Sequence, residues 1–363
     1  MRSRYALFTV FVAVALAVAG CGGDDTAATT TAAPTTTTAA ATTAAPGTTA
    51  AETPTTMAET TAAPTTPLRI AIVAPSAQND LAFTQSMVDA ANVIKSEMGN
   101  VEIAISDNLF VVDDAAAALR DYADQGYDLV IAHGSQYGGS LQEIAPDYPD
   151  VTFAWGTTTD TFGLDNVYSY EARADEGGYV MGVMAAALSQ SGVIGVVGPV
   201  EVGDAKLYID AFDKGALAEN PNADVKIVYT GSFSDVALAS ETAQSDISAG
   251  ADVLTGSSQS MVGAVGVAQE SNVLWFGTQA NQTQLAPDIV VASQVYHWEV
   301  VLRDIIAQVQ NKAADANHIY RINLANGGEV IEFNDGYDLP ADVRAKADAA
   351  INGIIDGSIV TGS

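Results

Sequence analysis

The chain is almost without cysteine, and it has few histidines. Cys21 is the only cysteine among 363 residues, so no disulfide can form within the chain and an apolar core must stabilise it. The three histidines, His133, His297 and His318, are too far apart for a metal motif of the usual short spacing. We therefore expect no metal ion and no cofactor.

The sequence also lacks the motifs of common enzyme classes. It has no P-loop ending in Gly-Lys-Ser/Thr, and it has no Gly-x-Ser-x-Gly nucleophile elbow. Two carboxylates could in principle act together in hydrolysis, and the sequence has many carboxylates. Without a further motif, we expect a protein that is not an enzyme and has no catalytic residues.

Positive charge is scarce. The chain has 14 Lys and Arg against 44 Asp and Glu, which gives a formal net charge of -30. Binding to phosphate groups requires an excess of Lys and Arg, so a nucleic acid or an anionic membrane surface is a poor partner. The simplest interpretation of the acidity is solubility outside the cytoplasm.

The first residues have the pattern of a bacterial lipoprotein signal. An apolar run follows Arg2 and Arg4 and ends at Val18-Ala19-Gly20-Cys21, with small residues before the cysteine. We expect residues 1–20 to be a signal peptide and Cys21 to be lipidated, which anchors the chain at the extracytoplasmic face of the cell membrane. The alternative is an ordinary signal peptide or a short membrane anchor, although a run of about 15 residues is shorter than the roughly 20 that span a bilayer.

Residues 21–67 follow as a linker made almost only of Thr, Ala and Pro. This composition offers no aromatic or long aliphatic side chain to bury, so it cannot offset the entropy of ordering a chain. We expect a disordered tether between Cys21 and the folded part. Thr and Pro also suit an O-glycosylated stalk, and this alternative stays open.

From Leu68 onward, short apolar runs alternate with helical patterns, which predicts α/β architecture with parallel sheets. Four expected strands, at residues 68–74, 101–106, 128–132 and 151–155, are followed by four more at similar spacings, at 193–198, 224–229, 252–255 and 273–276. At one common offset, Pro75 and Asp80 match Pro199 and Asp204. We interpret this as two copies of one Rossmann-like lobe, although unrelated strand–helix units can look alike by chance.

The predicted lobes comprise residues 68–171 with about 295–317, and residues 172–294 with about 318–363. In open α/β sheets, ligands bind beyond the carboxyl ends of the strands, so two facing lobes would place their ligand in the cleft between them. Loops there carry aromatic, hydroxyl, amide and carboxylate groups, which suit a small, flat, polar ligand. The alternatives are a core position for each Phe and helix capping for each Asp. The candidate ligand-binding residues are Asn79, Asp80, Phe83, Ser135, Thr157, Phe233, Asp235, Gln259, Gln279 and Trp298.

Several segments, in order, resemble the basic membrane protein family, the PnrA-like substrate-binding lipoproteins of ABC transporters, which include purine nucleoside receptors. They are residues 78–85 (QNDLAFTQ), 143–153 (EIAPDYPDVTF), 166–182 (NVYSYEARADEGGYVMG), 229–235 (YTGSFSD), 250–253 (GADV) and 287–298 (PDIVVASQVYHW). The resemblance implies a type I periplasmic-binding-protein fold. It also implies that Asp80 and Phe83 contact the ligand, that Phe233 stacks on it from the opposite lobe, and that Asn79 and Asp235 flank them.

Two departures from the family's nucleoside receptors bear on the ligand. Those receptors carry an acid for the ribose after the fourth strand of the second lobe, where this chain has Gly277-Thr278-Gln279-Ala280-Asn281-Gln282, and a lysine where it has residues 293–298. A purine nucleoside, a nucleobase and a related heterocycle therefore remain alternatives. We expect a monomer whose lobes close on the ligand, hinging near residues 169–173, 293–296 and His318. The resemblance implies partnership with an ABC permease and its ATPase; a ligand sensor with a signalling partner is the alternative.

Overall fold

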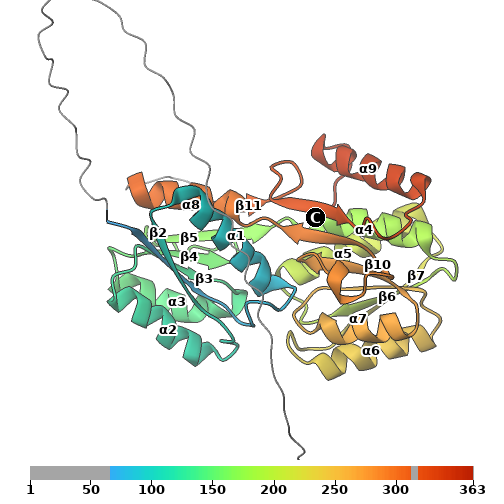
Figure 1. Cartoon of the computed structure of the whole chain (residues 1–363), viewed down its shortest axis with the longest axis horizontal. Coiled ribbons are helices and arrows are strands. Elements are labelled where there is room, and N and C mark those ends of the chain that lie inside the picture. Colours follow the sequence, from blue (N-terminus) through green and yellow to red (C-terminus); the bar gives the residue numbers. More distant parts are fainter. Residues whose placement is uncertain (1–65, 312–317, 363) are drawn as a thin grey trace, which may run out of the picture. The chain divides into compact units, whose positions relative to one another are not determined.

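The structure, a computed structural model, describes residues 66–311 and 318–362, in which two six-stranded sheets form (Figure 1). Both sheets belong to one compact unit of the chain. The first has the order β11-β5-β4-β3-β1-β2, and the second has the order β12-β10-β9-β8-β6-β7. The two orders are the same along the chain, so the repeat that the sequence predicted is confirmed.

The first sheet is parallel throughout. Its strands are β1 (Leu68–Val73), β2 (Val101–Ser106), β3 (Leu129–Ala132), β4 (Thr152–Gly156), β5 (Val167–Ala172) and β11 (Ile319–Ile322). In the second sheet only the pair β10–β12 is antiparallel. Its strands are β6 (Val193–Gly198), β7 (Asp224–Tyr229), β8 (Val253–Gly256), β9 (Leu274–Gln279), β10 (Val290–Tyr296) and β12 (Glu329–Phe333).

Helices cover both faces of each sheet, which is why the central strands are continuously apolar. On the first sheet, α1 (Phe83–Met98) and α8 (Glu299–Asn311) pack on one face, and α2 (Val112–Asp124) and α3 (Gly138–Ile144) pack on the other. On the second sheet, α4 (Ala174–Leu188), α5 (Gly203–Glu219) and α9 (Ala341–Ile355) oppose α6 (Val236–Ser248) and α7 (Met261–Glu270). We call each sheet with its helices the first and the second lobe.

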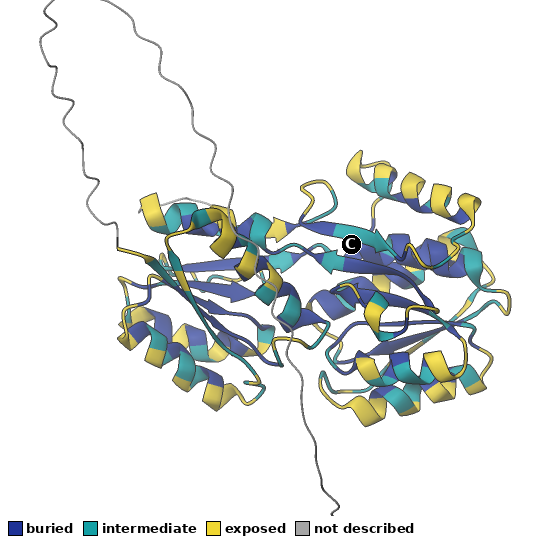
Figure 2. Cartoon of the chain, viewed as in Figure 1, coloured by how far each residue is buried: buried dark blue, intermediate teal, exposed yellow. Residues whose placement is uncertain are grey.

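The core follows the alternation of side chains along each strand. Ile70 and Ile72 of β1 face α1, whereas Ala71 and Val73 face α2 and α3. The cluster that contains Ile70 and Ile72 continues into the second lobe, where it includes residues of β6 and β8. Figure 2 shows the central strands buried and the outer surfaces of α2, α6 and α9 exposed. One shared core therefore joins the lobes.

Within the described residues, the chain crosses between the lobes three times: from β5 to α4, from β10 to α8, and from β11 to β12. The third crossing differs from the prediction, which placed it near His318 and assigned residues 318–363 to the second lobe. In the structure, β11 pairs with β5 of the first sheet, and Ser169 N donates a hydrogen bond of 2.7 Å to His318 O. The crossing thus follows Ile322.

Residues 1–65 lie outside the described part of the chain, so the predicted signal peptide and lipidated Cys21 do too, as does nearly all of the predicted linker. Within residues 66–311 and 318–362, no helix combines the length and the apolar character needed to cross a membrane.

Candidate functional site

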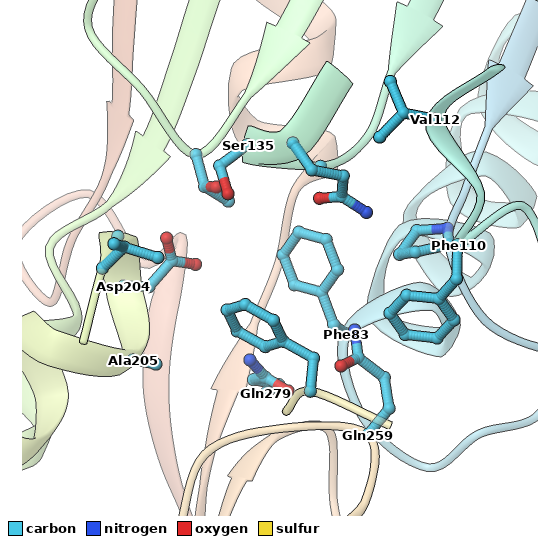
Figure 3. A pocket seen from close by; sticks show the side chains of 15 residues that line it. Phe83, Phe110, Val112, Ser135, Asp204, Ala205, Gln259 and Gln279 are labelled. Carbon is cyan, nitrogen blue, oxygen red and sulfur yellow. The ribbon is translucent and has the colours of Figure 1, made fainter. Parts of the chain in front are cut away.

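A cavity of about 250 Å³ lies where the carboxyl ends of the strands of both lobes meet (Figure 3). Its walls come from the loops and helix starts that follow β1 to β4 in the first lobe and β6 to β9 in the second. This is the position that the topology predicted for a ligand. The lining residues are Pro75, Phe83, Phe110, Val112, Gly134, Ser135, Gln136, Thr157, Val202, Gly203, Asp204, Ala205, Phe233, Gln259 and Gln279.

Six of the ten candidate ligand-binding residues line this cavity. The first lobe supplies Phe83, Ser135 and Thr157, and the second lobe supplies Phe233, Gln259 and Gln279. A molecule in the cavity would therefore touch aromatic, hydroxyl and amide groups from both sides. The structure brings these residues together, and their contact with a ligand stays a prediction.

In two of the remaining candidates, Asp80 and Asp235, the carboxylate accepts hydrogen bonds from backbone N–H groups at the start of a helix. Asp80 accepts hydrogen bonds from the backbone N–H groups of Ala82, Thr84 and Gln85 at 2.9 to 3.2 Å, and from the Ser76 hydroxyl at 2.6 Å. Asp235 is the N-cap of α6 and accepts two backbone hydrogen bonds at 3.0 Å. Neither residue is part of the cavity lining. The N-cap alternative therefore describes Asp235, and Asp80 serves the first turn of α1 in the same way from two residues before the N-cap Ala82.

Asn79 and Trp298 also lie outside the lining. Asn79 is exposed in the loop before α1. Trp298 is fully buried at the start of α8, and its indole N–H donates a 2.9 Å hydrogen bond to Ser86 Oγ on α1. Its ring meets that of Phe83 edge-on, at 6.4 Å between centroids. Trp298 therefore supports the wall of the cavity from behind.

Phe83 is held in place by His133. The two rings stack at 3.9 Å between centroids with an angle of 3° between their planes. His133 is fully buried, and burial lowers the pKa of its imidazole to about 3, so the ring is neutral. Its Nε2 lies 3.1 Å from the Phe83 carbonyl, which can only accept, so Nε2 carries the proton and Nδ1 accepts from the Tyr170 hydroxyl at 2.8 Å. This network presents Phe83 as a rigid flat surface.

Backbone strain occurs at the carboxyl ends of β4 and β9, the fourth strands of the two lobes. Thr157 has φ of 57° and Gln279 has φ of 71°, a region that residues with a side chain rarely adopt. Both line the cavity. Such strain gathers at binding sites, because it directs side chains that a relaxed turn would point elsewhere.

Asp204 was not among the candidate residues, although it lines the cavity and is only 6% exposed. It lies in the first turn of α5. Burial raises the pKa of its carboxyl to about 7, against an opposing hydrogen bond from its own backbone, and the nearby Glu171 adds to the increase. The match of Asp204 to Asp80 in the sequence repeat was the signal that could have identified it.

In the part of the chain that the structure describes, no group of His, Cys, Asp and Glu side chains is arranged to hold a metal ion. The cavity lining has hydrogen-bonding groups and one acid, but it has no histidine, thiol or lysine to act as a nucleophile or base beside that acid. The arrangement is suited to holding a molecule.

Known proteins resemble this chain in sequence and in structure. The family model described as ABC transporter substrate-binding protein, PnrA-like, matches residues 68–351. A purine-binding protein of Brucella abortus is 28% identical over 232 residues, which cover 64% of this chain and 65% of that protein, slightly under two thirds of its length. Basic membrane protein A of Borreliella burgdorferi is 27% identical over 285 residues, which cover 73% of this chain and 76% of that protein.

A solved structure shares the fold. The solute-binding protein of an ABC transporter system from Aeropyrum pernix superposes with a TM-score of 0.71 at 20% identity, covering 82% of this chain and 94% of that one. This supports the type I periplasmic-binding-protein fold that the resemblance implied. Proteins of the matched family bind solutes for transport and interact with permease components, so the expectation of a binding protein in place of an enzyme is confirmed. On the match over residues 68–351, the chain belongs to the PnrA-like family of ABC transporter substrate-binding proteins.

Proposed function

We propose that this chain captures a small, flat, polar ligand outside the cytoplasm and presents it to the permease of an ABC importer. The ligand class is a purine nucleoside, a nucleobase or a related heterocycle. Family membership supports the transport role, and the purine-binding relative from Brucella abortus supports the ligand class. Because the family match is to transport proteins, it favours import over the signalling alternative.

The observation that carries the proposal is that Phe83 and Phe233, from opposite lobes, line one cavity. Phe83 is backed by the neutral His133 ring, so its free face is fixed before a ligand arrives. A flat ring between two aromatic faces gains stacking and burial together. The amides of Gln259 and Gln279 and the hydroxyls of Ser135 and Thr157 would then orient the edge of the ligand.

Closure of the lobes would complete the site. A ligand that touches residues of both lobes favours the closed form, because only that form makes both sets of contacts. One direct contact between the lobes exists beside the cavity, where Gln282 Nε2 donates a 3.2 Å hydrogen bond to the Leu81 carbonyl. The closed surface would be what the permease recognises.

We further propose that a lipid on Cys21 holds the protein at the extracytoplasmic face of the cell membrane. The support is the sequence alone, with its basic start, apolar run and small residues before the cysteine. The Thr, Ala and Pro linker would give the receptor reach toward the permease.

Calorimetric titration and thermal unfolding of residues 62–363, the compact unit that contains both sheets, test the binding proposal. The probes are purine nucleosides, purine nucleobases and, as the competing class, glucose, since a relative from Haloferax volcanii carries the name of a glucose-binding protein. We expect a purine to bind and, at a hundred times its Kd, to stabilise the protein by about 2.7 kcal/mol.

Phe233→Ala should remove most of that stabilisation, because one stacking face is lost. Phe333→Ala is the matched control, since Phe333 lies on β12 and is not part of the cavity lining. Binding of glucose in place of every purine would contradict the proposed ligand class. An unchanged purine affinity in Phe233→Ala would contradict the stacking arrangement.

A further inference from the structure

Among the described residues that line the cavity, Asp204 alone has a charged side chain. It is 94% buried, since only 6% of its surface is exposed, and Figure 3 shows its carboxylate pointing from the second lobe into the space that Phe83 lines. Burying a carboxylate without partners is unfavourable by several kcal/mol, so natural proteins rarely retain one without a use.

The carboxylate of Asp204 lacks the partners that its counterpart has. Asp80, at the matching place of the first lobe, accepts hydrogen bonds from three backbone N–H groups and the Ser76 hydroxyl. By contrast, no donor among the described residues reaches Oδ2 of Asp204. Hydrogen bonds to the start of a helix account for the Asp80 carboxylate, but they do not account for Oδ2 of Asp204.

The side-chain amides of Gln259 and Gln279 also have an oxygen without a hydrogen-bond donor in the described part of the chain. Oε1 of Gln259 and Oε1 of Gln279 are buried, line the same cavity, and also find no donor within residues 66–311 and 318–362. No Lys, Arg or His belongs to the cavity lining. The cavity therefore has unused hydrogen-bond acceptors and no cation that could hold an anionic ligand.

We propose that Asp204 sets the ligand specificity of the cavity by accepting, as a carboxylate, two adjacent N–H donors from the edge of a flat heterocycle stacked on Phe83. The guanine edge, with its ring N–H beside an exocyclic amino group, has this chemistry. A planar pair of donors matches the two oxygens of a carboxylate and forms charge-assisted hydrogen bonds. The inference rests on the proposed function, whose ligand class it narrows.

The surroundings of Asp204 make this recognition dependent on pH. The groups that interact electrostatically with its carboxylate are Glu171 and the hydroxyls of Tyr170 and Tyr296. Glu171 is acidic, and the two hydroxyls stay neutral because burial raises their pKa values. His133, bonded to Tyr170, is neutral as well. Burial raises the pKa of the Asp204 carboxyl to about 7, and Glu171 adds to the increase, so a ligand that donates hydrogen bonds should bind more tightly above pH 7 than below it.

The test compares two pairs of ligands that differ by one amino group: guanine with hypoxanthine, and guanosine with inosine. Calorimetric titrations use residues 62–363 between pH 5.5 and 8.5, with wild type, Asp204→Asn and Asp210→Asn. Asp210 is the control because it lies on the same helix, is exposed and pairs with Lys206, away from the cavity lining. Thermal unfolding confirms that each variant is folded.

We expect wild type and Asp210→Asn to prefer the 2-amino member of a pair by about tenfold to a hundredfold at pH 8, and to lose that preference as the pH falls below 7. Asp204→Asn should lose this preference at every pH, because an amide has one acceptor and one donor, whereas the edge of the ligand presents two donors.

Equal binding within both pairs, or an unchanged preference in Asp204→Asn, would overturn the inference and leave the proposed function standing. Tighter binding of the 2-amino ligands below pH 7 would overturn it as well. If no purine binds, the proposed ligand class fails and the inference with it.

Discussion

Asp80 and Asp204 show how one residue at matching places in two lobes can take different roles. Both follow the first strand of their lobe and lie near the start of the next helix. The Asp80 carboxylate lies before α1 and satisfies its free N–H groups, whereas Asp204 lies within the first turn of α5 and points into the cavity. A shift of a few residues in the helix start therefore converts a capping acid into a cavity acid.

Asp204→Asn should stabilise the protein without ligand at pH 8. The pKa of the Asp204 carboxyl is about 7 in the folded state and 3.8 ordinarily. Between these two pH values the folded state keeps the carboxyl proton, whereas the unfolded state loses it. Stability from this group is therefore lost as the pH rises from about 4 to 7, with a full penalty on the order of 4 kcal/mol above pH 7. The variant cannot ionise at this position, so its advantage should appear between pH 5 and 8.

Chemical denaturation of wild type and variant across this pH range measures the effect. Asp246 and Glu329 also have raised pKa values, but they are common to both proteins and cancel in the difference. Asp210→Asn should show no comparable gain, because Asp210 is exposed. A constant stability difference between Asp204→Asn and wild type from pH 5 to 8 would count against a buried, ionising carboxyl.

The packing of α4 against α5 depends on glycines at the contact between these helices. A Cβ at Gly182 would lie 2.0 Å from the Phe212 carbonyl oxygen, and one at Gly178 would lie 2.4 Å from that of Tyr208. On the other helix, a Cβ at Gly215 would lie 2.1 Å from the Tyr179 carbonyl oxygen. The backbones therefore approach closely, which places the first turn of α5, with Asp204, against the base of the cavity.

Gly182→Ala should destabilise the fold by about 1–3 kcal/mol, because backbone atoms cannot yield to the added methyl group as a flexible side chain would. Gly266→Ala is the matched control: Gly266 lies in α7, and its added Cβ would meet nothing within 4 Å. Because alanine favours helix over glycine, this control should gain about 0.5–1 kcal/mol. Urea unfolding of the two variants measures both changes, and equal effects would show that close helix packing is not the cause.

The eight predicted strands correspond to β1–β4 and β6–β9, whereas β5, β10, β11 and β12 were not predicted, and one crossing between the lobes was misplaced. Strands buried on both faces are short, continuous apolar runs, and the repeat of such runs indicated two equivalent sheets. β11 was missed because it has only four residues, lies at the sheet edge and exposes Arg321 in its centre. Which sheet such a strand joins depends on distant packing, here on β5, and not on its own pattern.

The residues of the cavity were also predicted only in part, because their local sequence pattern does not show which side chains face the cavity. Loops after strands could be located from topology, so Phe83, Phe233 and the two glutamines were found. Helix capping and ligand binding both use Asp in such loops, so the sequence could not distinguish the role of Asp80 from that of Asp204. Trp298 lies outside the lining, and the sequence could not show this, because a buried aromatic beside a cavity and one that lines it have the same sequence signature.

Across the whole molecule, one core and three crossings connect the lobes. Trp298 follows the crossing out of β10, packs against Phe83 and donates a hydrogen bond to Ser86 on α1. A ligand on Phe83 would therefore press on the same aromatic cluster that the crossing segment packs against. This packing would connect the cavity to the closure of the lobes that we propose.

Replacement of the predicted lipid attachment site should release the whole protein from the membrane without affecting binding. Cys21 lies outside the described residues, and both sheets belong to a separate compact unit. In Cys21→Ser no thioether to a diacylglycerol can form, and the loss of two acyl chains removes firm anchoring. Cell fractionation with labelled palmitate should therefore find wild type labelled in the membrane fraction and the variant unlabelled. Purine affinity should be the same in both, since the cavity is built from residues 75–279. Palmitate label that persists in Cys21→Ser would exclude Cys21 as the attachment site, and a wild type that is unlabelled would exclude the lipid anchor itself.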